Sequence, residues 1–315
     1  MGILMRQTTL IDGRDEAPVR LQRQRPRANL QRYVALASVV IPTFGFALAV
    51  YIATQRGVGG MEIGLLAAMY LVTSIGVEAG FHRFFSHHSF RAGPAVTVAL
   101  GVAGSMAVQG PVLFWAAIHR KHHVFTDQPG DPHSPRLHGT GLWNGLRGFW
   151  HAHIGWLFTI DDADWGRYVS DLLRDRLTFN LNRLYPLWVL LGLVLPACAG
   201  GAIAGTWSGA GLGFLWGGLV RIFLVDQVTW SVNSIAHMTG SHPHKTACHS
   251  GNVALLSLLS AGGSWHNNHH ANPAAARTGQ RFWQIDPSGR FIELLGALGL
   301  ARDVRRGSRQ SRDTV

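Results

Sequence analysis

The histidines of this chain are grouped at spacings that suit metal binding. All seventeen lie between His82 and His270, and most fall in short clusters. Three clusters stand out, with the sequences HRFFSHH from His82, HRKHH from His119 and HNNHH from His266. Imidazole is a ligand for Fe, Zn, Cu or Ni, so the clusters predict a multi-histidine metal site without choosing the metal.

Helix geometry divides the second and third clusters into two sets of ligands. Residues i and i+4 of a helix are about 40° apart around the axis, whereas i+3 and i+4 are about 100° apart. His119 and His123 are therefore expected to share one metal, while His122 points to a neighbouring one. In the third cluster the first and last histidines should share a metal, and His269 should reach the other. The spacing favours a dinuclear centre between the two clusters.

Other residues near the clusters could complete or orient the site. Asn233 and His237 lie at i and i+4 at the end of the last apolar segment, and we expect both to contribute. Asp127 and Asp131 follow the second cluster, and carboxylates commonly orient and polarise metal-bound histidines. Glu78 lies one turn before the first cluster and is expected to support it.

Three charged residues lie in apolar segments, where an unpaired charge is costly. We expect Glu78 to pair with Arg221 or Asp226, and Asp226 is a further candidate for orienting the ligands. Most histidines outside the three clusters are expected to be capping, supporting or surface residues.

The composition is that of a membrane protein with basic polar ends. The chain has 315 residues, a formal net charge of +11 and 47% hydrophobic residues. Its arginines flank apolar segments rather than alternating with exposed aromatic residues, which argues against nucleic-acid binding and favours contact with membrane lipid. The only cysteines, Cys198 and Cys248, give no basis for a disulfide framework or a thiolate zinc site.

Four apolar segments have about the 20 residues needed to cross a bilayer: 33–53, 63–81, 185–205 and 212–234. The loop within each pair holds almost no charge, whereas the tails and the central region are rich in arginine. The positive-inside rule therefore places both termini and every histidine cluster in the cytoplasm. We expect a multi-pass protein of a bacterial cell membrane.

A further apolar stretch, residues 94–118, is predicted to be an interfacial or re-entrant helix. The predicted fold is an all-α integral membrane protein with four transmembrane helices, an interfacial helix and a cytosolic, histidine-rich helical cap. The predicted divisions are a basic cytoplasmic tail (1–32), a membrane domain (33–302) whose cap comprises 82–184 and 235–302, and a charged tail (303–315).

In their order along the chain, these motifs resemble those of the integral-membrane fatty acyl desaturases of the Δ9 stearoyl-CoA desaturase type. The resemblance includes HRFFSHHSF, HRKHH followed by Asp131-Pro132-His133, the segment from His153 to Trp156, and Asn233 to His237. It also includes WHNNHH before Pro273 and Arg277, and it covers about residues 35–300.

The resemblance implies a di-iron centre, with two Fe2+ ions, in a four-span protein with a cytosolic cap. Matched by motif, the nine histidine ligands and the asparagine that acts through water are His82, His87, His119, His122, His123, His237, His266, His269, His270 and Asn233. It also implies that O2 and two external electrons remove two hydrogens from adjacent methylene groups of a saturated acyl chain. The products are water and a cis double bond, with Δ9 as the expected position.

The sequence departs from this family pattern at two places. Gly262-Gly263-Ser264 replaces the usual Gly-Glu-Gly before the third cluster, and Glu78 is a candidate replacement for the missing carboxylate. Ala117-Ile118 replaces the Arg-Asp of animal acyl-CoA enzymes, so an acyl chain on CoA, a lipid or acyl carrier protein remains open. We expect a separate electron donor, such as ferredoxin or cytochrome b5 with its reductase.

Two alternatives remain compatible with the sequence. A hydroxylase or other oxidase on the same scaffold shares the first hydrogen removal with a desaturase, so the sequence does not separate them. A histidine-rich metal-binding or transport protein of the membrane is the other alternative. A transporter should place its ligands at mid-membrane on broken helices, whereas these clusters are expected at and beyond the cytoplasmic ends of the spans.

Overall fold

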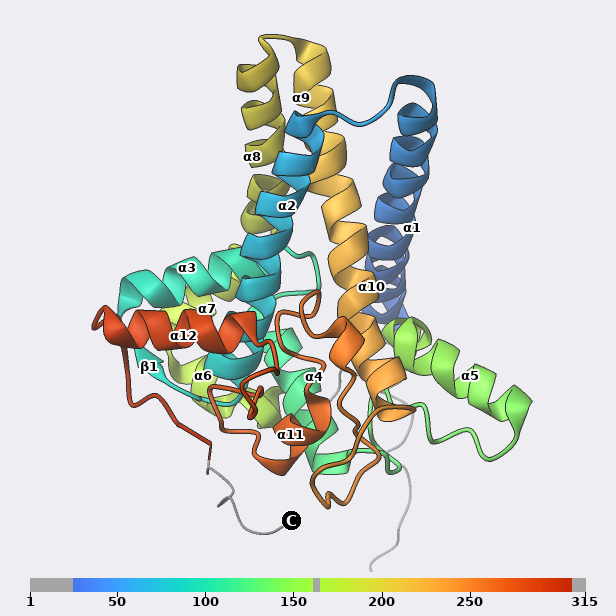
Figure 1. The fold of residues 1–315 in the computed structure, drawn as a ribbon. Helices are drawn as coiled ribbons and strands as arrows, with labels where there is room; N and C mark the ends of the chain where they lie inside the picture. Colours follow the sequence, from blue (N-terminus) through green and yellow to red (C-terminus); the bar gives the residue numbers. More distant parts are fainter. Residues whose placement is uncertain (1–24, 161–164, 308–315) are drawn as a thin grey trace, which may run out of the picture.

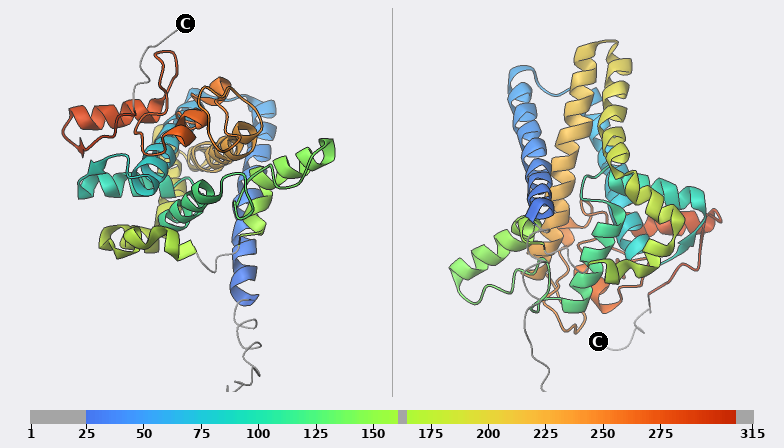
Figure 2. Two further views of the ribbon diagram at one scale, coloured as in Figure 1. Left: turned by 90° about the horizontal axis from the view of Figure 1, so that it is seen from below. Right: turned by 180° about the vertical axis from the view of Figure 1, so that it is seen from behind.

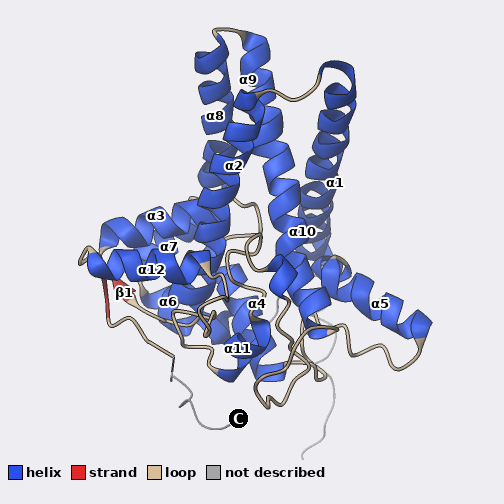
Figure 3. Ribbon diagram, in the orientation of Figure 1, coloured by secondary structure: helices blue, strands red, loops and turns tan. Residues whose placement is uncertain are grey.

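The computed structural model describes residues 25–160 and 165–307, which are mainly helical with several long loops and one short two-stranded sheet (Figures 1 and 3). Four helical segments are long and apolar enough to cross a membrane: Leu30–Arg56, Gly60–Ser86, Tyr185–Ala204 and Trp207–His237. The predicted all-α membrane fold with four spans is thus confirmed. Most of the predicted tails lies outside the described residues.

The second and fourth spans change helix type along their length. The second is α2 (Gly60–Ile75) followed by the π-helix η1 (Gly76–Ser86). The fourth is α9 (Trp207–Gly213), the π-helix η4 (Phe214–Val220), α10 (Arg221–Ser234) and the 3-10 turn η5 (Ile235–His237). Both spans continue past the predicted limits of 81 and 234, so the first histidine of the HRFFSHH cluster and His237 lie on the spanning helices themselves.

The stretch predicted as one interfacial helix is two helices. Gly110 has a φ of 96°, in the left-handed region that favours glycine, and Pro111 follows it, so the chain turns between α3 (Pro94–Ser105) and α4 (Val112–Phe125). The helix α3 is too short to span and lies beside the base of the second span, whereas α4 descends below the spans (Figure 1). This separation lets α4 carry the second histidine cluster away from the bilayer.

The other elements lie around the same end of the spans. The helices α5 and α12 extend to opposite sides of the bundle (Figures 1 and 2). The first and third spans lie in α1 (Arg25–Arg56) and α8 (Tyr185–Ala204). The elements outside the spans are α5 (Leu142–His153), η2 (Gly155–Phe158), η3 (Trp165–Val169), α6 (Ser170–Arg174), α7 (Arg176–Arg183), η6 (Ala254–Leu256), α11 (His266–Ala271), α12 (Pro287–Ala297) and the paired strands β1 (Arg91–Ala92) and β2 (Ala301–Arg302).

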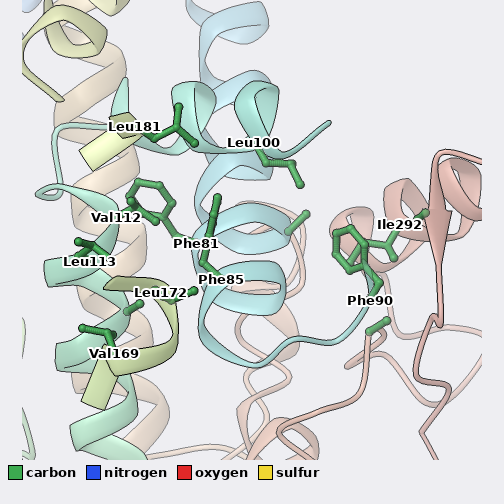
Figure 4. Packing of buried hydrophobic residues seen from close by; sticks show 14 of the residues in the cluster. Phe81, Phe85, Phe90, Leu100, Val112, Leu113, Val169, Leu172, Leu181 and Ile292 are labelled. Carbon is green, nitrogen blue, oxygen red and sulfur yellow. The ribbon is translucent and has the colours of Figure 1, made fainter. Parts of the chain in front are cut away.

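One face of η1 carries the largest buried core cluster. Phe81 and Phe85 are almost completely buried against α4 and its neighbours, including Val112 and Leu113 (Figure 4). Leu181 of α7 completes this wall. Because the apolar face of η1 is fixed in this way, its opposite, histidine-bearing face has a fixed direction.

Arg221 joins three helices inside the membrane region. Its Nη2 donates to the carbonyl of Gly192 at 2.8 Å, its Nε donates to Gly217 at 3.1 Å, and its Nη1 donates to the carbonyl of Met106. Pro196 follows Gly192 by four residues in α8 and has no N–H, so the Gly192 carbonyl lacks its usual helical donor. The guanidinium supplies the missing donor, which explains a fully buried arginine without a carboxylate partner.

Replacing Arg221 with Met should lower the free energy of unfolding by about 2–4 kcal/mol, because buried carbonyls lose their donors. The loss should be smaller in a Pro196→Ala background, where the new N–H at position 196 can bond to Gly192. Thermal unfolding of the four proteins of this double-mutant cycle, in detergent, measures the coupling. Strictly additive effects would contradict this role for the Gly192 carbonyl.

Candidate metal centre

The structure brings all nine predicted histidine ligands together in two adjacent groups. We call them site A (His82, His87, His119, His123 and His269) and site B (His122, His237, His266 and His270). Within each group the candidate ligand nitrogens lie within 4.8 Å of one another. The division of the second and third clusters between the sites is the one expected from helix geometry.

The π-helix explains how the first cluster contributes two side chains to site A. His82 and His87 are five residues apart, which on an α-helix would point them in different directions. In a π-helix the repeating hydrogen bond joins residues i and i+5, so positions five apart lie close to one face. His82 lies inside η1, and His87 caps its end by donating its N–H to the carbonyl of His82.

The Nε2 atoms converge at distances that suit ligands of a common cation. In site A the Nε2 atoms of His87 and His119 are 2.7 Å apart, and that of His269 lies 2.9 Å from the Nε2 of His123. The separations in site B include 2.9 Å between His237 and His266, 3.0 Å between His266 and His270, and 3.4 Å between His122 and His270. Two ligands at right angles, each about 2.1 Å from a metal, would be about 3.0 Å apart. The residues therefore fit a pair of metal ions.

Carboxylates hold the outer nitrogens of two site B ligands. The Nδ1 of His122 donates to Asp131 at 2.9 Å, and that of His237 donates to Asp127 at 3.2 Å. These bonds place the proton on Nδ1 and leave the Nε2 lone pair free to bind a metal. Burial alone would raise the pKa of Asp127, but its hydrogen bond with His237 holds the pKa below the usual value.

Seven of the nine ligand imidazoles are held in their neutral form. Burial, reinforced by the neighbouring imidazoles, lowers the pKa well below the usual histidine value for these seven: His87, His119, His122, His123, His266, His269 and His270. A neutral imidazole can donate a lone pair, so the environment favours metal binding at physiological pH.

Two asparagines hold the short helix α11 in place. The Nδ2 of Asn267 donates to the carbonyl of Ser250 at 3.0 Å. On the other side, the Nδ2 of Asn268 donates to the carbonyl of Thr278 at 2.9 Å, and its Oδ1 accepts from Asn252 at 2.8 Å. A six-residue helix is not stable alone, so these bonds fix the direction of its three histidines.

Glu78 supplies the carboxylate for site A. Its Oε1 accepts a hydrogen bond from the Nδ1 of His82 at 2.8 Å and forms an ion pair with Arg83. Its Oε2 is only 2.9 Å from the point that a Cβ on Gly263 would occupy. The carboxylate of Glu78 thus fills the space beside Gly263.

The expected pairing of Glu78 with Arg221 or Asp226 is wrong. Arg221 binds backbone carbonyls, and Asp226 accepts a hydrogen bond from Gln109 at 3.1 Å. Asp226 therefore contacts none of the nine histidines directly. Gln109 in turn accepts from the indole N–H of Trp115, whose ring stacks on that of a site A ligand on α4.

Arg83 is an important residue that sequence reasoning missed. Its buried guanidinium binds Glu78 and Asp286, at 3.1 and 2.9 Å, and also donates to Thr278. These bonds tie η1 to the segment that follows the third cluster. In the sequence, Arg83 stands out as a charged residue directly after His82, at the end of a membrane span. Its partner Asp286 lies about two hundred positions later in the chain, so the pairing could not be inferred from the sequence.

Two other residues lie close to the ligands. The ring of His133 stacks on that of His122, with centroids 4.4 Å apart, and burial lowers its pKa to about 3. Asn233 lines a cavity with His82 and His266, and its amide makes no hydrogen bond to the described residues. Its predicted water-mediated role stays a prediction.

The cavity beside site A has a volume of about 50 Å³. It lies between the second and fourth spans and α4, and its lining includes His82 and His119 of site A and His266 of site B. The residues that supply its apolar wall are Val77, Trp115, Val225, Val228 and Val232. An apolar chain placed there would lie against the candidate metal centre.

Changing Asp131 to Asn should weaken metal binding at site B by about 10- to 100-fold, because the amide does not hold the His122 proton as a carboxylate does. Asp171→Asn is the matched control, since Asp171 bonds the exposed His88 at 2.8 Å outside both sites. Metal content after dialysis against graded chelator measures the difference. Equal metal retention in both variants would remove the role assigned to Asp131.

The chain shows similarity to known proteins over most of its length. Residues 61–286 match the family model described as fatty acid desaturase. The chain is 42% identical over 268 residues to a hex-5-enoyl-acyl-carrier-protein acetylenase from Moorena producens, covering 84% of each chain. It is 36% identical to an sn-1 stearoyl-lipid 9-desaturase from Synechocystis sp. (77% of this chain and 71% of the relative) and to Delta-9 acyl-lipid desaturase 1 from Arabidopsis thaliana (78% and 75%). The chain therefore belongs to the fatty acid desaturase family.

Proposed function

We propose that the protein is an O2-dependent di-iron desaturase that introduces a cis double bond into a saturated fatty acyl chain, with Δ9 as the expected position. The observation that carries this proposal is that ligands of both sites, His82, His119 and His266, line a cavity between membrane spans whose wall is largely apolar. The nine histidines and Asn233 are the proposed ligands, with Asn233 acting through water.

Iron suits this role because an unactivated C–H bond offers no handle to an acid or a base, whereas iron with O2 can oxidise it. In the balanced reaction, O2 takes two hydrogens from adjacent methylene groups, together with two external electrons and two protons. The products are a carbon–carbon double bond and two water molecules. A separate electron donor, such as ferredoxin or cytochrome b5 with its reductase, is part of the proposal.

The side chains of the protein position the substrate and keep the site dry. Val77, Val225 and Trp115 line the cavity and exclude water from the reacting methylene groups. Glu78 and Asp131 hold protons on the Nδ1 atoms of their histidines, so that the ligand nitrogens keep their direction. We place these functions, and both chain termini, on the cytoplasmic side of a bacterial cell membrane.

A second candidate is an acetylenase, which would remove two further hydrogens from an existing double bond. It is favoured by the 42% identity to a relative named for that activity on an acyl-carrier-protein substrate. The lipid-named relatives at 36% identity favour an acyl-lipid substrate. The carrier is therefore proposed only as CoA, lipid or acyl carrier protein.

Two alternatives from the sequence receive less support. A hydroxylase or other oxidase would use the same iron centre and the same cavity. A metal transporter should hold its ligands near mid-membrane, whereas α4 and α11, which supply six of the nine histidines, lie below the spans (Figure 1).

Expression of the chain in a host that lacks its own desaturase should produce new unsaturated fatty acids. His269→Ala should reduce them by at least about 100-fold, because His269 is a central member of site A. His249→Ala is the control, since this exposed histidine belongs to neither site. Lipid analysis with double-bond mapping measures both amount and position. Hydroxylated chains as the main product would overturn the desaturase proposal.

Saturated and monounsaturated chains, each offered on CoA, phospholipid and acyl carrier protein, should separate the two candidate functions. We expect the saturated chain to be consumed faster and to give an alkene, because most of the relatives reported above are desaturases. Mass spectrometry of purified protein with a reduced electron donor measures the products. A predominant triple-bond product would establish the acetylenase instead.

A further inference from the structure

The helix α5 presents an exposed apolar face that belongs to neither metal site. Trp143, Leu146 and Trp150 lie on this face at i, i+3 and i+7, and their exposed fractions are 76%, 50% and 62%. The opposite face is built from small residues: Gly148 approaches the carbonyl of Pro135 so closely that a Cβ there would lie 2.0 Å from it. The aromatic residues are thus directed away from the protein.

The depth of α5 follows from its contact with the first span. Val39 of α1 packs in the cluster that contains Trp156 of η2, the turn that directly follows α5. Seventeen residues separate Val39 from Arg56 at the far end of α1, which corresponds to roughly 26 Å of helix. Since the hydrocarbon core of a bilayer is about 30 Å thick, a bilayer whose far boundary lies at Arg56 would place η2 and the adjoining end of α5 near its other boundary.

The direction of α5 agrees with this depth. In Figures 1 and 2 the helix leaves the bundle sideways, at the end of the spans where the histidine clusters lie. A helix at this depth with exposed tryptophans on one face is typical of elements that lie in the membrane interface. If these indoles faced water, the protein would expose a large apolar surface, which is unusual unless the surface binds something.

A groove of about 620 Å³ runs along the same face, and its lining includes the cation Arg147. The residues that line it are His138, Trp143, Leu146, Arg147, Trp150, His151, Gly155 and Thr159. Arg147 makes no ion pair or hydrogen bond with the described residues. The described residues that line the groove include no carboxylate, which favours an anionic over a cationic headgroup.

We propose that this groove binds an anionic phospholipid of the surrounding bilayer, on the side of the histidine clusters. Arg147 pairs with the lipid phosphate, the imidazoles of His138 and His151 offer further hydrogen bonds, and the indoles of Trp143 and Trp150 lie against the upper part of the acyl chains. The site is separate from the metal centre and does not depend on the proposed reaction.

The lipid would act on the protein through the base of α5. His153, at the end of the helix, bonds to Ser234 at 3.0 Å and to Gln227 at 3.1 Å, both on α10. A ligand on α5 therefore stabilises the folded arrangement of α5 and the fourth span. Ligands that bind only the folded state raise the unfolding temperature in proportion to the logarithm of their concentration.

The test uses the full chain, purified in detergent, and follows its unfolding temperature during titration with phosphatidylglycerol, phosphatidylcholine or inorganic phosphate. Phosphatidylglycerol should stabilise the wild type, phosphatidylcholine should do so less, and phosphate alone should have no effect. Arg147→Gln should raise the phosphatidylglycerol concentration needed for half of the effect about five- to tenfold. Trp150→Ser should also weaken it.

Lys245→Gln is the matched control, because Lys245 is an exposed cation in the loop after α10, outside the groove. Its titration should match that of the wild type. The proposal fails if Arg147→Gln and wild type give the same titration, or if both phospholipids act equally. It also fails if Arg147→Gln leaves lipid stabilisation unchanged but raises KM for the acyl substrate, which would assign the groove to the substrate carrier. If the wild type is a dimer with or without lipid and Trp150→Ser is a monomer, the groove is instead a contact surface for a second copy of the chain.

Discussion

The convergence of nine imidazoles is the constraint on which the rest of the structure depends. Several ligand pairs place their Nε2 atoms about 3 Å apart, and in a neutral imidazole whose Nδ1 proton is held by a carboxylate the Nε2 presents a lone pair. Such lone pairs repel one another unless a cation lies between them. The protein counters this repulsion with rigid supports, which include the packed face of η1, the asparagine anchors of α11 and the three carboxylates. Folding thus prepares the site before a metal binds.

Helix periodicity predicted much of this arrangement. It divided the second and third clusters between two sites, because α4 and α11 are α-helices and the α-helical angle applies to them. The first cluster required another rule, since its five-residue spacing brings His82 and His87 together only in the π-helix η1. Nothing in ordinary α-helical propensity predicts that change of register. The spacing itself was a signal, because two ligands five residues apart need either a π-turn or a helix end.

Long-range pairings were harder to predict from one sequence. Glu78 and Arg221 are both charged residues in membrane spans, and pairing them was chemically reasonable. The structure instead pairs Glu78 with His82 and Arg83, while Arg221 serves the carbonyl left free by Pro196. A backbone acceptor gives no sequence signal of its own, so an apparently unpaired charge can be fully satisfied. The space beside Gly263 was also invisible until the position of the Glu78 carboxylate was known.

The placement of the cavity indicates which residues can change the product without changing the chemistry. The histidine ligands and their carboxylates determine how metal is held, and four of these residues, His82, His119, His266 and Glu78, line the cavity. The wall is supplied by apolar side chains of the second and fourth spans and α4, which determine which methylene groups of an acyl chain can lie next to the ligands. Relatives named as an acetylenase and as a 9-desaturase match 84% and 77% of this chain. Under the proposed function, substitutions in the wall are expected to redirect the reaction while the metal centre stays the same.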